Sequence, residues 1–429
     1  MSIEGAVATL GNLAGWHVRP LRSLVKQTKD LGHPELELLG VSLAHGVRPR
    51  WGEDGRPAAS LDLGGYKRVR PGEIVMNALG KPHGSIGRSA QEGITSPAYW
   101  VLECSEHADS RFLHYLLRSN HMVNEYQRLG KYLPPNQFNI SWDLFRDIAV
   151  PLPPLEEQRR IADFLDDQVS LMDKVVEMRI RQNGVSEELL QATLDKILSG
   201  TNQRVPIKHI ATVRYGLGQP PPESESGVPI IRATNISRGT VTIPNLIFAK
   251  LQDLPLSRAP LLESGEILVV RSGALTGDST IIRDEWAGAS PGYDLRITPN
   301  RKVIFPDYLA WILLSRQVHQ EISLLSSRAA QPHLNAEELG NLKVPMVSMS
   351  TQIETSSKLD EVQNKVRSAQ SLMAQSRLGI GERKRALITA AVTGKLDVTS
   401  ARPVSETELI LNTDLGTHEG LQSSAGGIR

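Results

Sequence analysis

The stretch from Pro151 to Gly200 decides the fold, and it reads PLPPLEEQRRIADFLDDQVSLMDKVVEMRIRQNGVSEELLQATLDKILSG. Its prolines suit the residues before a helix and in its first turn, and Glu156 and Glu157 suit the positive N-terminal end of a helix dipole. Apolar residues then recur without a further proline until Gly200, which suits the position just after a helix. The stretch predicts one helix of about 44 residues, roughly 66 Å long at about 1.5 Å per residue.

The same stretch occurs a second time in the chain. Pro151 corresponds to Pro345 and Gly200 to Gly394, an offset of 194 residues in both cases. One face of the second copy follows alternating steps of three and four residues, which is the spacing of a coiled coil. That face is formed by Leu359, Val362, Val366, Ala369, Met373, Ser376, Ile380, Arg383, Leu387 and Ala390. We therefore expect the two long helices to pack on each other as an antiparallel coiled coil.

The repeat extends upstream of the long helices. Three matches have offsets of 193 or 194: Gly72-Glu73-Ile74 with Gly265-Glu266-Ile267, Ser96-Pro97-Ala98-Tyr99 with Ser290-Pro291-Gly292-Tyr293, and Gln137 with Gln331. Short predicted strands and one predicted helix per copy, at 109–126 and 306–325, follow the same order in both. A mixed globular domain followed by a long helix is therefore used twice.

These patterns predict an α/β (α+β) fold with a pseudo-two-fold internal repeat. The expected parts are a globular domain at 1–150, a long helix at 151–200, a second globular domain at 201–345, a second long helix at 346–399 and a tail at 400–429. Because the tail is polar and rich in glycine, we expect it to be mobile.

Composition excludes several classes of protein. The chain has 429 residues and a net charge of +1, which is not the strongly basic balance of a general nucleic-acid binder. Cys104 is the only cysteine, so a disulfide framework and a cysteine-based zinc site are excluded and a reducing compartment is expected. The sequence has neither an apolar run of membrane-spanning length nor a secretory signal. We expect a cytoplasmic protein that does not enter membranes.

Motifs for catalysis are missing or incomplete. Gly216-Leu217-Gly218 lacks the third glycine of a dinucleotide fingerprint, and Gln219-Pro220 opposes the helix that should follow. Walker A, His-Glu-x-x-His and Gly-x-Ser-x-Gly sequences are absent. The two Ser-Pro-x-Tyr sequences vaguely resemble the Pro-Pro-Tyr motif of DNA amino-methyltransferases, but each lacks the second proline. We interpret them as structural turns whose tyrosine anchors the fold, and we predict no catalytic residue and no metal site.

Basic residues near the repeated turns are the candidates for binding a polyanion. They are Lys67, Arg68, Arg70, Lys81 and Arg88 in the first domain, and Arg271, Ser272 and Arg283 in the second. Arginine and lysine suit phosphates and the major-groove edge of guanine. A solvated surface explains any one of these residues equally well.

Residues 151–161, which read Pro-Leu-Pro-Pro-Leu-Glu-Glu-Gln-x-x-Ile, resemble the start of the central conserved region of specificity (S) subunits of type I restriction-modification systems. The order of domains and helices is similar to that family across nearly the whole chain. Gln137-Phe138-Asn139-Ile140 before the first helix and Ile197-Leu198-Ser199-Gly200 at its end support the resemblance. The second copy departs from the pattern, since Val347-Ser348-Met349 replaces the second proline pair.

The resemblance implies a non-catalytic reader of double-stranded DNA. Each globular domain would be a target-recognition domain for one half of a split, asymmetric site, and the helices would fix the spacing. Two modification subunits would carry S-adenosylmethionine and transfer a methyl group to adenine N6. Restriction subunits would use ATP and Mg²⁺ for translocation and cleavage. The chain itself would hold no cofactor.

Positions on the helices are expected to form the docking surface for the modification subunits. We expect exposed apolar and acidic positions near Glu156, Glu157, Gln158, Ile161 and Phe164, with Gln352 and Leu359 in the second copy. Two other classes stay open. A coiled-coil scaffold would have no affinity for DNA, and a catalytic DNA methyltransferase would bind S-adenosylmethionine by itself.

Overall fold

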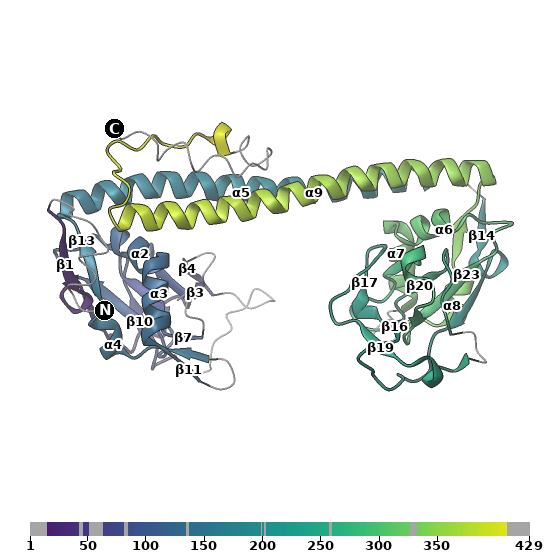
Figure 1. Ribbon diagram of the computed structural model, residues 1–429, viewed down its shortest axis with the longest axis horizontal. Coiled ribbons are helices and arrows are strands. Elements are labelled where there is room, and N and C mark those ends of the chain that lie inside the picture. Colours follow the sequence, from purple (N-terminus) through teal and green to yellow (C-terminus); the bar gives the residue numbers. More distant parts are fainter. Residues whose placement is uncertain are drawn as a thin grey trace. The chain divides into compact units, whose positions relative to one another are not determined.

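The computed structural model describes residues 15–42, 46–50, 63–80, 85–133, 137–198, 200, 203–256, 260–326 and 333–409. The chain divides into two compact units. Unit 1 comprises Met1–Arg179 and Ala374–Arg429, and unit 2 comprises Ile180–Met373. Each unit therefore contains a globular domain and about half of each long helix (Figure 1).

Unit 1 is built on a four-stranded antiparallel sheet in the order β2-β10-β6-β8. These strands are β2 (Val25–Thr28), β6 (Ile74–Asn77), β8 (Ser85–Arg88) and β10 (Trp100–Cys104). Smaller sheets are formed by β1 (His17–Pro20) with β13 (Ala149–Leu152), β3 (Leu39–Ser42) with β4 (Gly46–Pro49), β5 (Lys67–Val69) with β9 (Gly93–Thr95), and β11 (Lys131–Leu133), β12 (Gln137–Asn139) and β7 (Leu79–Gly80). The helices are α2 (Ser110–Arg118), α3 (Asn120–Leu129) and α4 (Trp142–Arg146). Apolar residues of α2 and of the main sheet share one core.

Unit 2 repeats this architecture. Its main sheet has the order β15-β23-β20-β21, with β15 (Ala211–Tyr215), β20 (Ile267–Val269), β21 (Ser279–Ile281) and β23 (Leu295–Pro299). Smaller sheets are β14 (Arg204–Pro206) with β24 (Lys343–Pro345), β16 (Val228–Ile231) with β19 (Ile247–Ala249) and β22 (Ser290–Pro291), and β17 (Ile236–Ser237) with β18 (Thr240–Val241). The helices are α6 (Pro306–Leu313), α7 (Arg316–Ser326) and α8 (Ala336–Asn341). The predicted mixed fold and the internal repeat are therefore confirmed.

The repeated Gly-Glu-Ile motif is a turn whose conformation requires glycine. Gly72 has φ 92° and Gly265 has φ 86°, values that residues with a Cβ atom rarely adopt. The following glutamate closes the turn. Glu73 Oε2 accepts the backbone N–H of Arg70 at 2.6 Å, and Glu266 Oε2 accepts that of Glu263 at 2.8 Å.

In each globular domain, the single helix that the sequence predicted is divided into two helices. The predicted helix at 109–126 divides at Ser119, whose Oγ donates to Leu116 O at 2.7 Å and accepts Met122 N–H at 3.4 Å. The predicted helix at 306–325 divides at Ser315 in the same way, through Ile312 O at 2.6 Å and Val318 N–H at 3.4 Å. A serine that caps the following helix can interrupt a continuous apolar pattern.

The two long helices are α5 (Leu155–Leu198) and α9 (Met349–Val392), as the repeat predicted. In unit 1 the start of α5 packs against the end of α9, and Lys384 Nζ binds Asp173 at 2.7 Å. In unit 2 the end of α5 packs against the start of α9, and Gln370 donates to Glu187 at 3.3 Å. The pairing is therefore antiparallel in each unit. Most of the predicted α9 face is buried or half-buried, but Arg383 is exposed, which corrects that position.

The segment after α9 contacts the long helices within unit 1. Val404 N–H donates to Gln168 Oε1 on α5 at 2.9 Å. Leu409 is 1% exposed and packs with Met172, Val175 and Ile380. Val404 and Leu409 therefore lie against the long helices, and the mobility of the tail stays a prediction. Residues 410–429 lie outside the described part of the chain.

Candidate nucleic-acid interface and helix junctions

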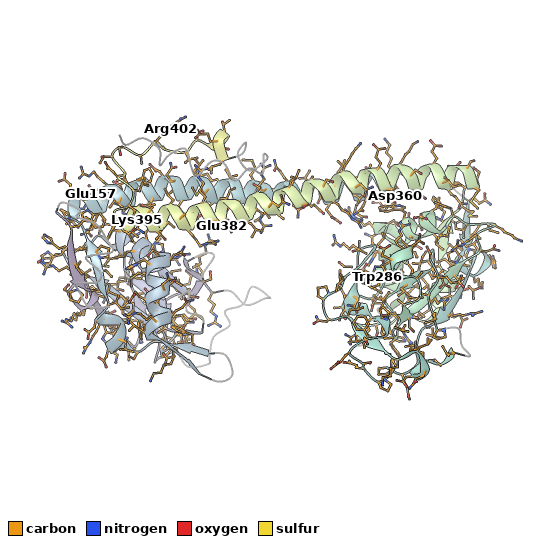
Figure 2. All side chains as sticks on the ribbon, in the orientation of Figure 1. Glu157, Trp286, Asp360, Glu382, Lys395 and Arg402 are labelled. Atoms are coloured by element: carbon orange, nitrogen blue, oxygen red, sulfur yellow. The ribbon has the colours of Figure 1, made fainter. Side chains whose placement is uncertain are left out.

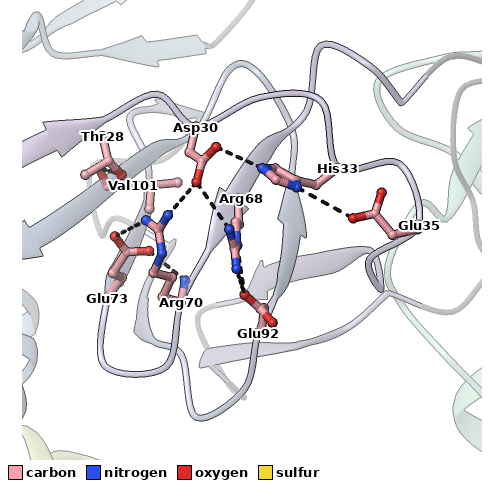
Figure 3. A network of polar contacts seen from close by, with 9 residues as sticks. All are labelled: Thr28, Asp30, His33, Glu35, Arg68, Arg70, Glu73, Glu92 and Val101. Atoms are coloured by element: carbon pink, nitrogen blue, oxygen red, sulfur yellow. Dashed lines mark hydrogen bonds and ion pairs between the residues drawn. The ribbon is translucent and has the colours of Figure 1, made fainter.

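Arg68 and Arg70 belong to a charged network on the surface of unit 1 (Figure 3). The carboxylate of Asp30 binds both guanidinium groups and also His33, whose Nε2 lies 2.9 Å from Asp30 Oδ1. Arg68 also donates to Glu92 at 2.7 Å. The hydrogen bond with His33, with the positive charges of both arginines nearby, holds the pKa of Asp30 below its usual value. Both arginines are therefore held in place by acids of their own domain.

Lys67 is buried, although the sequence suggested an exposed cation. Its side chain reaches inward and donates from Nζ to Tyr99 O at 2.6 Å. Burial lowers the pKa of Lys67, and the nearby charge of Lys29 lowers it further. The contact joins β5 to the first Ser-Pro-x-Tyr turn, so Lys67 supports the fold at this position.

The remaining basic candidates have different surroundings. Arg88 donates from Nε to Ser110 Oγ at 2.8 Å, at the start of α2. The exposed Arg283 pairs with Asp307 in the first turn of α6. Lys81 lies outside the described residues. The turn after Arg70 contacts the end of β8, which carries Arg88. In unit 2, Arg283 follows the end of β21 that pairs with the start of β20, whereas Arg271 and Ser272 follow the end of β20.

Arg271 is the candidate with the most distinctive environment. Its guanidinium carbon lies 4.7 Å from the centre of the Tyr215 ring and 4.1 Å from that of Tyr293. The group donates toward His333, with NH2 2.9 Å from Nε2. Both tyrosines are 51% exposed. Ser272 forms an isolated antiparallel bridge with His333, which holds the two segments together.

The sequence did not predict Tyr215 or His333 as site residues, because they are distant in the chain from Arg271. Tyr293 was interpreted as an anchor of the fold, yet half of its surface is exposed and its ring contacts Arg271. In the sequence, only the repeat of the Ser-Pro-x-Tyr motif indicated that Tyr293 has a special role. We refer to Tyr215, Arg271, Tyr293 and His333 as the Arg271 cluster.

Gln158 and Gln352 join each long helix to its globular domain. Gln158 Oε1 accepts Asp109 N–H at 2.8 Å, and its Nε2 donates to Pro153 O at 2.9 Å and to His107 O at 3.0 Å. Gln352 repeats this arrangement with Phe305 N–H at 2.7 Å and Val347 O at 2.9 Å. Both glutamines are fully buried. They satisfy backbone groups at the starts of α2 and α6, which would otherwise lack a partner.

Four of the seven predicted docking residues are not exposed. Gln158, Ile161, Gln352 and Leu359 are each at most 1% exposed, so the expectation that they form an exposed surface is wrong. Their side chains hold the helices to the domains instead. Among the other three, Glu156 is exposed, Glu157 pairs with Arg160, and Phe164 is half-buried against the core of unit 1.

A second repeated contact lies about two turns further along each helix. Tyr115 OH donates to Asp166 Oδ1 at 2.6 Å, and Trp311 Nε1 donates to Asp360 Oδ1 at 3.0 Å. Figure 2 shows Asp360 on α9. Burial raises the pKa of Asp360, and the bond from Trp311 partly opposes that change. Both domains are therefore fastened to their helix by a buried amide and by a carboxylate.

Other kinds of site are missing from the part of the chain that the structure describes. No group of three or more histidine, cysteine, aspartate and glutamate side chains there could hold a metal ion. None of the helices in that part is long and apolar enough to cross a membrane.

The chain therefore belongs to the class of proteins in which a globular domain and a long helix occur twice. The family model for the type I restriction modification DNA specificity domain matches residues 68–177. The type I restriction enzyme MjaVIII specificity subunit of Methanocaldococcus jannaschii is 23% identical over 352 residues, covering 77% of this chain and 80% of that protein. The EcoBI specificity subunit of Escherichia coli is 28% identical over 255 residues, covering 52% of this chain and 53% of that protein.

A solved structure has the same fold. It comes from a study of the structural basis of complex assembly and conformational transition of the type I R-M system. It superimposes with a TM-score of 0.68 at 18% identity, over 90% of this chain and 99% of that chain. The sequence matches confirm the predicted resemblance to the specificity subunits of type I restriction-modification systems, and the structural likeness shows the shared fold alone.

Proposed function

We propose that the chain reads a bipartite, asymmetric DNA site, with one half read by each globular domain. The duplicated fold carries this proposal, because two related domains can address two half-sites. Their surfaces differ: unit 1 presents the Asp30 network and unit 2 presents the Arg271 cluster. Different surfaces favour different half-sites. Half-sites in successive major grooves lie roughly 34 Å apart, which is less than the roughly 66 Å length of a 44-residue helix such as α5.

The chain acts as a non-catalytic subunit in this proposal. Two modification subunits dock on the helical regions, bind S-adenosylmethionine and methylate adenine at N6. The target adenine leaves the base stack to reach their active site. Restriction subunits add translocation and cleavage, which use ATP. Glu156, Glu157 and Phe164 remain the candidates for the docking surface, since these three predicted side chains keep some exposure.

Arg68, Arg70, Arg88, Arg271, Ser272 and Arg283 are the proposed DNA contacts among the described candidates. Arginines already paired with acids can still bind phosphate, but they must exchange one partner for another. Such contacts position the protein and carry little sequence information. We assign Arg68, Arg70 and Arg283 to this positioning role because each has an acidic partner in its own domain.

Co-expression with a candidate modification subunit tests the proposed function. We expect N6-methyladenine in host DNA at one bipartite motif, with two different halves and a fixed spacer, detected by single-molecule sequencing. A strain that expresses the modification subunit alone is the control and should show no such motif. A stable complex of the two proteins without any methylated motif would contradict the proposal and would favour a scaffold.

A further inference from the structure

The Arg271 cluster is built from four segments of unit 2 that meet at one end of its main sheet. Tyr215 ends β15, Arg271 lies just after β20, and Tyr293 precedes β23. His333 comes from the segment before α8, where Leu334 N–H donates to Arg271 O at 2.8 Å. We propose that Arg271, held between Tyr215 and Tyr293, contacts a guanine in the half-site that unit 2 reads. This inference rests on the proposed function.

Arg271 is held in position by contacts on several sides. Its backbone N–H donates to Asp294 Oδ1 at 3.2 Å, and Asp294 is buried. The Tyr215 ring, which covers one face of the guanidinium, is itself fixed because its hydroxyl accepts Ala336 N–H at 3.3 Å. Less side-chain entropy is lost on binding when an arginine is already ordered in this way. A fixed, planar group with parallel N–H donors matches O6 and N7 of guanine.

The surroundings of the Arg271 guanidinium differ from those of three other predicted arginines. Arg68, Arg70 and Arg283 each have a carboxylate within ion-pair distance. Among the described residues, Arg271 has no such carboxylate partner, and its guanidinium meets two aromatic faces and an imidazole. Both rings of this stack are half exposed. The cluster therefore presents an ordered cation beside two exposed aromatic surfaces.

The equivalent position of unit 1 lacks an arginine. The offset that aligns Gly72 with Gly265 aligns Ala78 with Arg271, and Ala78 is 5% exposed. The domains therefore share the sheet but not the proposed guanine contact. If Arg271 reads a base, its removal should change only one half of the recognised site.

The test uses the full chain in complex with its modification subunit and maps methylated motifs for the wild type, Arg271→Ala and Arg271→Lys. Exchange of residues 201–345 identifies the half-site that unit 2 reads, because only that half should change. In the wild-type motif, we expect this half to contain a G·C pair. In both variants, discrimination at that pair should fall by about tenfold to a hundredfold, the range for loss of a bidentate contact. The other half and the spacer should stay unchanged. Because lysine keeps the charge, Arg271→Lys keeps the test valid if Arg271→Ala fails to assemble.

Arg214→Ala is the matched control. Arg214 is exposed and precedes Tyr215 on β15, so its side chain points to the opposite face of the strand. This variant should keep the wild-type motif. The inference is overturned if both Arg271 variants keep full discrimination, if methylation falls equally at all sequences, or if the half read by unit 2 has no G·C pair. Absence of any motif with the wild-type chain would instead contradict the proposed function.

Discussion

Replacing Arg296 with methionine is expected to lower the free energy of unfolding of unit 2 by about 3 to 5 kcal/mol. This is the cost of leaving one charge of a buried ion pair without its partner. Arg296 and Glu266 form two parallel contacts, from NH2 at 2.6 Å and from Nε at 2.8 Å. Their side chains are 14% and 3% exposed. Without Arg296, the carboxylate would stay buried with only Thr298 Oγ1 and Glu263 N–H as partners.

The double variant Arg296→Met with Glu266→Gln separates the buried charge from the loss of packing. The neutral amide can still accept a hydrogen bond from Glu263 N–H, so most of the lost stability should return. Denaturant unfolding of the full chain, with hydrogen exchange to localise the change to unit 2, measures both effects. A single variant within about 1 kcal/mol of the wild type would show that this pair contributes no more than a surface pair.

Replacing Gln158 with alanine should destabilise unit 1 by about 2 to 4 kcal/mol. Three backbone groups lose a buried hydrogen-bond partner, and an unsatisfied buried group costs about 1 to 3 kcal/mol. Asp109 N–H is the most affected, since Gln158 Oε1 is its acceptor at the start of α2. Hydrogen exchange should accelerate at this amide and in the first turns of α5. Gln352→Ala should have the same effect on Phe305 N–H in unit 2.

Gln158→Glu distinguishes hydrogen bonding from volume. It keeps the size of the side chain but places oxygens near Pro153 O and His107 O, which need a donor. We expect this variant to be at least as destabilising as Gln158→Ala. The exposed neighbour Arg159 supplies the control, and Arg159→Ala should change stability by no more than about 0.5 kcal/mol. A stable Gln158→Glu variant would contradict the assigned role of the amide.

The long helices and the repeat could be predicted because their signals are periodic and extend over many residues. The proline-rich start, the apolar spacing and the terminal glycine all agree over Pro151–Gly200. The Gly-Glu-Ile repeat could be found because a turn with positive φ restricts the residue type. In each copy, one predicted helix is divided into two helices. The break was not predicted, because Ser119 and Ser315 interrupt the apolar pattern without changing its period.

The candidate site was harder to predict, because its parts meet only in the folded chain. Nothing near Arg271 in the sequence indicates that Tyr215 and His333 lie beside it. Gln158 was expected on an exposed docking surface, yet three backbone groups near the starts of α2 and α5 are its hydrogen-bond partners. Basic residues also do not reveal from sequence whether an acid neutralises them, as Asp30 does for Arg68 and Arg70.

The most direct test of the account is a domain exchange. Residues 201–345 are replaced by the corresponding domain of another specificity subunit, and the chimera is co-expressed with the modification subunit before methylated motifs are mapped. We predict that one half of the motif changes to that of the donor, while the other half stays the same. A motif that changes in both halves, or in neither, would contradict the assignment of one half-site to each domain.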